Sequence, residues 1–203
     1  MVKFSVRSNS LRTLLAGVAV VLSLQSGLAV AKDGAQSAFI SEMIGQLDRA
    51  KGQIIALEGA IPQGKFTWRP AEGVRSISEV YLHIADANYL FMSFAGAKPP
   101  MDMKQMMDQK AREGATTDKT KIAASLNASF DWTKNALSAL TDADLEKQVN
   151  MFGTKTTVRN ALLTMLGHLH EHLGQSIAYA RSNGVIPPWT EEMQAQVKKS
   201  LNK

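Results

Sequence analysis

The stretch MLGHLHEHLGQSIAYARSNGVIPPW, residues 165–189, decides the fold of this chain. Its apolar positions recur at spacings of three and four, and they are Met165, Leu166, Leu169, Leu173, Ile177 and Ala180. This spacing is typical of an amphipathic helix rather than of a strand. We expect the helix to end at Asn183-Gly184, because glycine readily takes the left-handed backbone of a helix stop and Pro187-Pro188 cannot continue a helix.

Three of the four histidines in the chain lie in this stretch, at positions 168, 170 and 172. Residues four apart share one face of a helix, so His168 and His172 point the same way, while His170 and the surface acid Glu171 point elsewhere. Two imidazoles one turn apart can bind a single metal ion, as they do in the H-E-x-x-H pattern. The pair alone is a weak signal, because histidines also occur as satisfied groups in a protein core.

The fourth histidine, His83, lies in a second helical pattern, SISEVYLHIADANYLF, residues 76–91. A capping-box signature, S-x-x-E, opens this pattern. His83 is flanked by apolar residues, so its helix can pack beside the one that carries the histidine pair. A buried imidazole needs partners for both ring nitrogens, which makes three of them in one place unusual without a metal. We predict that His83, His168 and His172 meet inside a helical bundle and hold a divalent metal ion.

Three histidine ligands with one open position form the pattern of a catalytic zinc site rather than of a closed structural site. Such an ion lowers the pKa of a water molecule in the open position toward ~7. Nickel, iron and manganese also accept imidazole ligands, so the residues do not choose among these metals. The chain has no cysteine, which excludes thiolate ligands and cysteine nucleophiles.

Two polar residues close to the histidines are candidates for catalytic roles. Asp86 lies one turn after His83, and Gln175 lies three residues after His172. Either side chain could hydrogen-bond a metal ligand or a bound water molecule. Exposure to solvent is the alternative for both residues, as it is for Glu79.

Four long helical patterns with few strand signals predict an all-α protein, a four-helix bundle. These patterns cover residues 38–59, residues 76–91, a helix from Thr117 or Asp118 through Leu137, and a helix capped by Thr157 that runs to Arg181. Residues 144–156 are predicted to be a linker, and residues 189–201 an amphipathic tail on the surface. We expect Trp68 to be buried as an anchor, because tryptophan carries a large apolar area.

Residues 101–113 are rich in methionine, which occupies positions 101, 103, 106 and 107. We expect a short irregular helix here. Thioether sulfur atoms suit copper(I), so metal binding is one interpretation of the stretch. The alternative, which we favour, is a pliable apolar cover over the bundle, because methionine fills irregular gaps.

The first 31 residues show the three parts of a secretory signal peptide. The basic start contains Lys3, Arg7 and Arg12, the apolar run extends from Leu14 to Leu24, and the small-residue cleavage site is Ala29-Val30-Ala31. The apolar run is short for a membrane span. We therefore predict a signal peptide at 1–31, a bundle domain at 32–203, and secretion across the inner membrane to a periplasmic or extracellular location, without a stable membrane anchor.

The net charge argues against nucleic-acid binding. The whole chain carries +5, but residues 1–31 hold three basic residues and no acid, so the remainder carries +2. A nucleic-acid surface needs clustered lysines and arginines, and the sequence shows no such cluster. We expect a small-molecule substrate, and we leave a homodimer open.

Two phrases of the sequence resemble the signatures of the DinB-like superfamily of metalloenzymes. They are FTWRPAEGVRSISEVYLHIAD at residues 66–86 and GHLHEHLGQSIAYARSNGVIPP at residues 167–188. The resemblance implies an up-down-down-up four-helix bundle with a three-histidine metal site, often with zinc or nickel. Carried over to this sequence, the ligands fall on His83, His168 and His172, and His170 matches no ligand position.

The activities that the resemblance implies are transfer and isomerisation reactions that depend on mycothiol, bacillithiol or a glutathione-like thiol. The predicted signal peptide argues for a different reaction, because such thiols are scarcer outside the cytoplasm. We therefore hypothesise a metal-dependent hydrolase or transferase that acts on a small substrate. The alternatives are a non-catalytic protein that binds a small ligand or a partner helix, and a metal-handling protein of the cell envelope.

Overall fold

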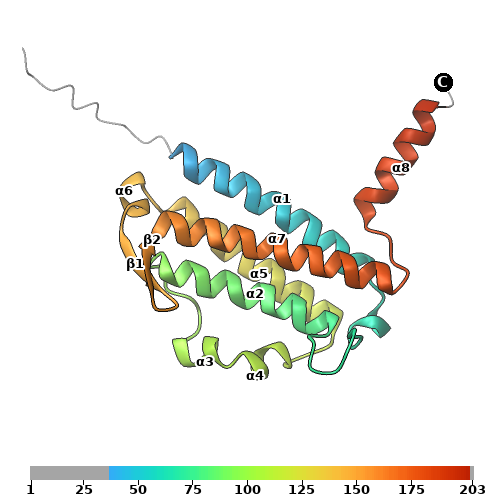
Figure 1. The fold of residues 1–203 in the computed structure, drawn as a ribbon, viewed down its shortest axis with the longest axis horizontal. Coiled ribbons are helices and arrows are strands. Elements are labelled where there is room, and N and C mark those ends of the chain that lie inside the picture. Colours follow the sequence, from blue (N-terminus) through green and yellow to red (C-terminus); the bar gives the residue numbers. More distant parts are fainter. Residues whose placement is uncertain (1–36, 202–203) are drawn as a thin grey trace, which may run out of the picture. The chain divides into compact units, whose positions relative to one another are not determined.

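The computed structural model describes residues 37–201, and the predicted signal peptide at residues 1–31 lies outside the described residues. Most of the described chain belongs to four long helices, which are α1 (Ala38–Ala60), α2 (Ile77–Phe94), α5 (Lys119–Ser138) and α7 (Val158–Ser182). Helices α1 and α7 run in one direction and α2 and α5 in the other, which is the up-down-down-up topology (Figure 1). The predicted all-α four-helix bundle is confirmed.

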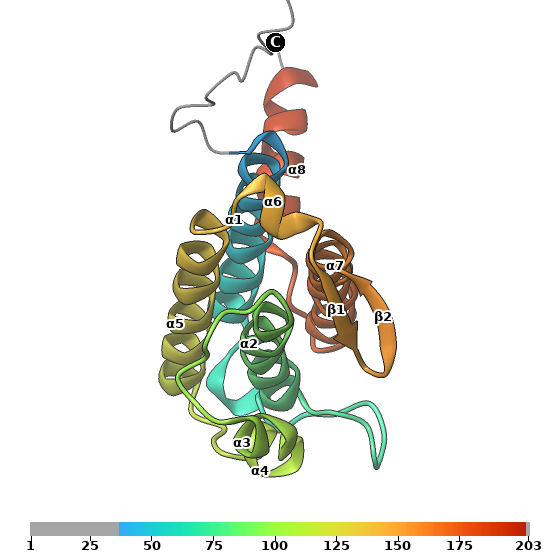
Figure 2. The ribbon, with the colours of Figure 1, turned by 90° about the vertical axis from the view of Figure 1, so that its left-hand side faces the viewer.

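The four helices pack in the cyclic order α1, α5, α2, α7, so that α2 contacts both α5 and α7 (Figure 2). Their apolar faces meet in one core, where Ile54 of α1, Tyr81 of α2 and Phe130 of α5 are fully buried. Burial of such a side chain contributes roughly 1.5–3 kcal/mol. This core holds α2 and α7, the two helices that carry the predicted metal ligands, side by side.

Side-chain caps begin three of the four long helices, α2, α5 and α7, at the positions that the sequence predicts. The Ser76 hydroxyl accepts a hydrogen bond from the Glu79 backbone N–H, and the Glu79 carboxylate accepts one from the Ser76 backbone N–H. This is the capping box predicted for α2. The side chains of Asp118 and Thr157 cap α5 and α7 by accepting hydrogen bonds from backbone N–H groups of the first turn. The caps therefore fix the register in which α2 and α7 present their histidines.

Helix α7 ends at the predicted stop. Gly184 has a φ of 73°, and the N–H groups of Asn183 and Val185 both donate to the Ala180 carbonyl at 2.9 Å, which closes the last turn of the helix. Helix α8 (Pro188–Leu201) follows as the predicted surface tail, has no buried residue and projects from the bundle (Figure 1). None of the helices within residues 37–201 combines the length and apolar character that crossing a membrane requires.

A β-hairpin occupies much of the stretch that the sequence predicts as a linker. Strands β1 (Gln148–Met151) and β2 (Thr154–Thr157) pair antiparallel, with Met151 opposite Thr154. The two turn residues, Phe152 and Gly153, have φ values of 51° and 85°, and a type I′ turn needs positive φ at both positions. The linker prediction was wrong because the turn lacks the usual Asn-Gly signal and each strand has only four residues.

Short helices complete the described chain, and they are η1 (Gln63–Lys65), α3 (Met103–Met107), α4 (Gln109–Glu113) and α6 (Asp142–Leu145). The irregular helix predicted over residues 101–113 is thus a pair of five-residue helices that meet at Asp108. Helix α4 packs against α2. Because of this contact, the end of α4 lies beside the middle of α2, where His83 is placed.

The prediction that Trp68 is a buried anchor needs a correction. Trp68 is only half-buried, and its ring packs edge-on against Tyr179 with the ring centroids 5.3 Å apart. The fully buried aromatic residue of this connector is Phe66, which packs against Tyr81. Phe66 lies in a turn directly after η1 rather than in an extended segment, and the sequence alone did not show which of the two rings faces the core.

Candidate metal centre

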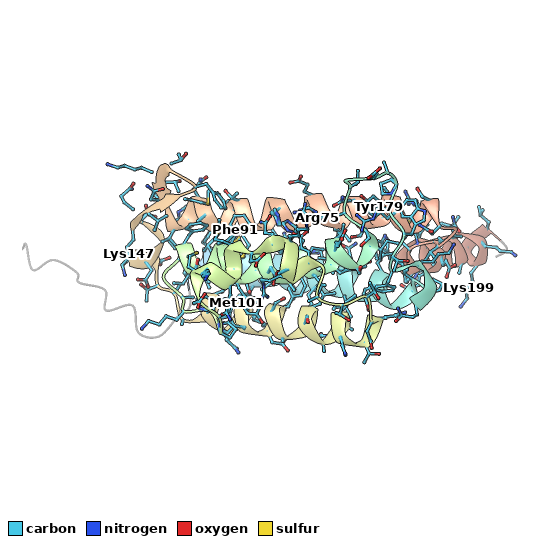
Figure 3. All side chains as sticks on the ribbon, turned by 90° about the horizontal axis from the view of Figure 1, so that it is seen from below. Arg75, Phe91, Met101, Lys147, Tyr179 and Lys199 are labelled. Carbon is cyan, nitrogen blue, oxygen red and sulfur yellow. The ribbon has the colours of Figure 1, made fainter. Side chains whose placement is uncertain are left out.

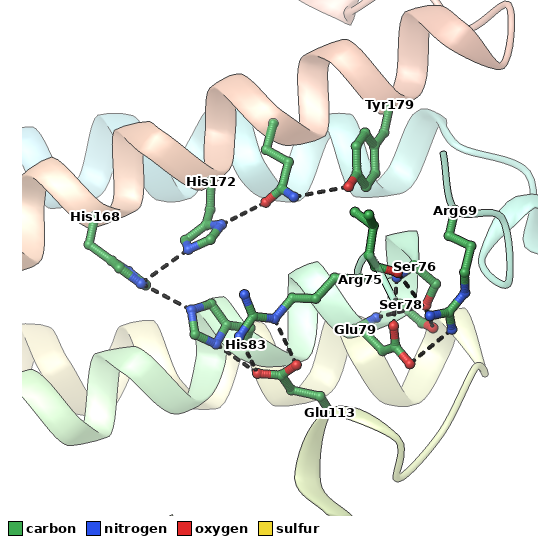
Figure 4. Close-up of polar contacts among 12 residues, drawn as sticks. Arg69, Arg75, Ser76, Ser78, Glu79, His83, Glu113, His168, His172 and Tyr179 are labelled. Atoms are coloured by element: carbon green, nitrogen blue, oxygen red, sulfur yellow. Dashed lines mark hydrogen bonds and ion pairs between the residues drawn. The ribbon is translucent and has the colours of Figure 1, made fainter. Parts of the chain in front are cut away.

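Three histidine rings converge between α2 and α7 (Figure 4). His83 comes from α2, whereas His168 and His172 come from successive turns of α7. The Nε2 atom of His168 lies 3.0 Å from Nε2 of His83 and 3.1 Å from Nε2 of His172. The possible ligand atoms of the three rings all lie within 4.8 Å of one another. The structure therefore brings together the three residues that the sequence predicts as metal ligands, here called the histidine site.

The outer nitrogen of His83 is held by an acid from a different part of the chain. The His83 Nδ1–H donates to Oε1 of Glu113, at the end of α4, at 2.8 Å. Arg75 in turn donates to both oxygens of that carboxylate, from Nε at 2.7 Å and from Nη2 at 3.0 Å. Such a two-point contact fixes the plane of a carboxylate. Glu113 therefore sets the tautomer and the orientation of the His83 ring.

The outer nitrogen of His172 is held within α7 itself. The His172 Nδ1–H donates to Oε1 of Gln175 at 2.8 Å, and Nε2 of Gln175 donates to the Tyr179 hydroxyl at 3.0 Å. Tyr179 packs against Trp68, which limits its movement. This chain of contacts places Gln175 against a predicted ligand, as the sequence suggests, although its catalytic role stays a prediction.

The protonation of the site favours a cation at the meeting point of the rings. A neutral imidazole carries one N–H, and for His83 and His172 that N–H is on Nδ1, so both Nε2 atoms present lone pairs. The single His168 ring can offer at most one Nε2–H, which cannot satisfy both lone pairs. Within residues 37–201 the buried Nδ1 of His168 has no hydrogen-bond partner. A bound cation would satisfy the converging lone pairs, because metal ions accept them together.

The spacing of the nitrogen atoms also fits a metal ion. Zinc binds imidazole nitrogen at about 2.0–2.1 Å, which puts neighbouring ligand nitrogens about 3.3 Å apart in a tetrahedral site. The distances of 3.0 and 3.1 Å from His168 to the other rings are close to this value. The donor set, three imidazoles without carboxylate or sulfur, suits zinc, nickel or iron better than magnesium or calcium.

Burial lowers the pKa of two of the three rings, His168 and His172. His172 is 7% exposed, while His83 and His168 are half-buried. Burial, followed by the neighbouring rings of His172 and His83, lowers the pKa of His168 to about 3. Burial and the His83 ring also lower the pKa of His172, against the opposing hydrogen bond from Gln175. Neutral rings are the forms that bind a metal.

The carboxylate beside the site is ionised, although it is largely buried. Burial alone would raise the pKa of Glu113, but hydrogen bonds from His83 and Arg75 outweigh it and hold the pKa below the usual value. An ionised carboxylate on the far side of a histidine raises the basicity of the ring as a ligand. The positive charge of Arg75 balances that of Glu113, and this offsets the free-energy cost of burying the carboxylate.

Asp86, the second residue predicted to be catalytic, faces away from the rings. Its carboxylate is bound by Arg112 of α4 in an ion pair. Burial raises the pKa of Asp86 against the opposing effect of Arg112. Both residues line a cavity of about 550 Å³ between α2, α4 and α5, to which Tyr89 also contributes. Asp86 has no hydrogen bond to the histidine site among the contacts of residues 37–201, so its catalytic role stays a prediction.

The residues predicted to lie outside the site do so. His170 is exposed, and its Nδ1–H donates to the Leu166 carbonyl at 2.8 Å. Glu171 is also exposed. In the methionine-rich stretch Met106 is 4% exposed, whereas Met103 and Met107 are 51% and 61% exposed. One inward methionine with two outward ones fits the apolar cover better than a copper site.

Sequence reasoning missed two residues of the site, Glu113 and Arg75. Glu113 lies on another helix, 30 residues after its partner His83 in the sequence. Arg75 directly precedes the capping serine of α2, and its place in the sequence suggests only a solvated charge.

The fold is similar to those of several solved structures. A DinB-like protein from Bacillus cereus matches with 21% identity and a TM-score of 0.64, over 73% of this chain and 95% of that protein. YfiT from Bacillus subtilis, described as a probable metal-dependent hydrolase with an unusual four-helix bundle topology, matches with 18% identity and a TM-score of 0.57, over 75% and 92%. A mycothiol-dependent maleylpyruvate isomerase matches with 13% identity and a TM-score of 0.54, over 68% and 62%.

At these identities the structural matches establish the fold alone. No curated protein matches the chain. The family comparison is more extensive, because the DinB superfamily pattern matches residues 46–176. That range contains His83, His168 and His172 and spans well over half of the 203 residues. The chain belongs to the DinB superfamily.

Proposed function

We propose that this protein is a metal-dependent enzyme, a hydrolase or transferase that acts on a small molecule at the histidine site. The observation that carries the proposal is the convergence of three Nε2 atoms, two of which must present lone pairs because Glu113 and Gln175 occupy the opposite ring nitrogens. His83, His168 and His172 would hold one divalent ion, with zinc or nickel favoured and iron or manganese compatible.

Each residue of the site has a separate task in this proposal. A divalent ion with three nitrogen ligands would supply Lewis-acid activation of a substrate group or of water. Glu113 holds His83, Gln175 holds His172, and Arg75 keeps the Glu113 carboxylate ionised and in plane. Gln175, whose amide lies beside a proposed ligand, is also the candidate to orient a substrate. The apolar core behind the rings excludes water from the protein side.

The proposed location of the protein favours hydrolysis over thiol transfer. One neighbour in fold is described as a probable metal-dependent hydrolase and another as a mycothiol-dependent isomerase, so the fold accommodates both. We propose that residues 1–31 direct export to the periplasm or the exterior, where small thiols are scarcer. The substrate we propose is a small molecule and not a nucleic acid, because the charge outside residues 1–31 is only +2.

A second candidate is a non-catalytic protein of the cell envelope that binds a metal or a small ligand. The low exposure of His172, 7%, favours it, because a deeply placed ion exchanges its open position slowly. The two candidates differ in whether a water molecule on the bound ion exchanges with solvent. Water relaxation of the manganese-loaded protein measures this exchange directly, and slow exchange supports the binding protein.

The proposal is tested by metal analysis joined to activity. The protein is stripped with a chelator, dialysed against zinc, nickel, manganese or iron(II), and analysed for bound metal. We expect one equivalent of metal per chain, and hydrolysis of a panel of small esters and amides, or thiol transfer, that disappears on chelation and returns with metal. Activity that survives chelation, in a protein that retains no metal, would contradict the proposal.

Removal of the Glu113 side chain should weaken metal binding without removing a ligand. In Glu113→Ala the His83 Nδ1–H loses its acceptor and Arg75 loses its partner, so we expect the dissociation constant for zinc to rise by about 10–100-fold. Competition with a coloured chelator measures the constant. Glu171→Ala is the matched control, because this acid neighbours His172 in sequence but is exposed. Equal increases of the zinc dissociation constant in the two variants would contradict this role of Glu113.

A further inference from the structure

A chain of aromatic rings leads from the histidine site to the tip of the hairpin. The Phe91 ring of α2 lies 5.3 Å from the His168 ring, centroid to centroid. The Phe152 ring, from the turn between β1 and β2, lies 6.2 Å from Phe91 and 5.1 Å from Phe94. Phe91 lies along the seam between α2 and α7 on which Arg75 also lies (Figure 3). Phe91, Phe94 and Phe152 are called the aromatic wall.

The exposure of the wall increases with distance from the core. Phe91 is 5% exposed, Phe94 is half-buried, and Phe152 is 64% exposed. Phe152 thus presents most of its ring to solvent while one edge rests on two buried or half-buried rings. An apolar group that lay against it would be removed from water on one side without any rearrangement of the core.

The backbone at Phe152 has a conformation that is unfavourable for a bulky side chain. Phe152 has a φ of 51° and is the only residue other than glycine with positive φ within residues 37–201. Type I′ turns favour asparagine followed by glycine, and a bulky residue at this position is costly. A ring that is mostly exposed recovers little of that cost through packing. Strain of this kind occurs where a side chain must be aimed at a ligand.

We propose that Phe152 is a substrate-binding residue of the histidine site, and that the aromatic wall selects substrates with an aromatic or similarly apolar group. The inference rests on the proposed function, because the reacting part of the substrate is taken to bind the single metal ion of the histidine site. The reacting group faces His168, and the apolar group extends toward the hairpin and lies against the ring of Phe152, the exposed end of the wall. The hairpin thereby supplies a specificity element that the four-helix bundle itself lacks.

Two other roles of Phe152 would lead to different results when the ring is removed. The ring could serve only to anchor the hairpin on α2, in which case its removal would lower stability and leave ligand preference unchanged. It could also be a contact between two copies of the chain, together with the exposed Leu163 of α7. In that case its removal would change the mass of the protein in solution and leave ligand preference unchanged.

The test uses two metal-directed probes that differ only in their apolar part, acetohydroxamate and 3-phenylpropanohydroxamate. Their dissociation constants for the zinc-loaded protein are measured by calorimetry. We expect the phenyl probe to bind the wild-type protein at least about tenfold more tightly, a preference that corresponds to the partial burial of one ring. In Phe152→Asn we expect most of that preference to be lost, while the acetohydroxamate constant changes less than about twofold.

The variants are chosen so that a folding defect cannot imitate the expected result. Asparagine suits the type I′ turn, so the melting temperature of Phe152→Asn should stay close to that of the wild-type protein or rise. Phe152→Gly tests the same point with a second residue that accepts positive φ. Leu163→Gln is the matched control, because it also removes an exposed apolar side chain but one without a ring contact to the wall.

Each outcome decides the proposal. A wild-type protein that binds both probes equally, or a preference that survives in Phe152→Asn and Phe152→Gly, overturns it. A change in mass in Phe152→Asn with an unchanged preference assigns Phe152 to an interface and overturns it as well. If the wild-type protein binds neither zinc nor acetohydroxamate, the proposed function is wrong, and this inference, which depends on it, is wrong as well. Loss of the preference with intact acetohydroxamate binding supports it.

Discussion

Replacing His168 with alanine is expected to raise the dissociation constant for zinc by more than about 100-fold. The Nε2 atom of His168 is the common neighbour of the other two Nε2 atoms, at 3.0 and 3.1 Å. Loss of a group that only orients a ligand lowers metal affinity by about 10–100-fold, so loss of the ligand itself should lower the affinity further. Competition titration with a coloured chelator, at fixed pH and salt, measures the change.

The control for this variant lies two residues along the same helix. His170→Ala removes an identical side chain from α7, but His170 is exposed and bonds the Leu166 carbonyl. We expect the zinc affinity of His170→Ala to match that of the wild-type protein within about twofold. Affinities that fall equally in the two variants would show that zinc binds histidine on the surface rather than at the histidine site.

Metal binding is also expected to stabilise the fold strongly. The histidine site joins α2 to α7 and has no counterpart in an unfolded chain, so an ion that binds it stabilises only the native state. At a free zinc concentration of about 1,000 times the dissociation constant, the free energy of unfolding should rise by about 4 kcal/mol. Urea unfolding followed by circular dichroism, with and without zinc, measures the difference, and a chelator should reverse it.

His83→Ala separates this stabilisation from nonspecific effects of zinc. The variant keeps both histidines of α7 but cuts the link to α2, so zinc should no longer couple the two helices. We expect its unfolding free energy to change by less than about 1 kcal/mol on addition of the same zinc. A wild-type protein without stabilisation, or a variant stabilised as much as the wild-type protein, would contradict a site shared between the helices.

The helices and the three histidines were predictable because their signals are local. The caps at Ser76, Asp118 and Thr157, and the stop at Gly184, each act within one turn of the chain. The pair His168 and His172 follows from helical periodicity alone. His83 required one further step, the packing of two apolar helix faces, which a four-helix bundle provides with few alternatives.

The environment of the histidines was not predictable, because it depends on contacts between distant segments. Glu113 reaches His83 only because the five-residue helix α4 packs across α2. Asp86 lies one turn from His83 in sequence, yet its direction around the helix takes it to Arg112 and the neighbouring cavity. Sequence spacing placed Asp86 on the correct helix but did not show that its carboxylate pairs with Arg112.

The hairpin was missed for a related reason. Four-residue strands carry too short an alternation to be distinguished from a linker, and Phe152-Gly153 replaces the usual turn signal. Consistency between local sequence and fold breaks down at this turn. Such departures are expected at functional positions, which agrees with the role proposed for Phe152.

The most direct test of the central claim is X-ray absorption spectroscopy of the protein loaded with one equivalent of zinc. We expect a coordination shell that contains three imidazole nitrogens at about 2.0–2.1 Å and one additional light atom. A shell with two imidazoles or fewer, or one made mainly of oxygen atoms, would contradict a metal site formed by His83, His168 and His172.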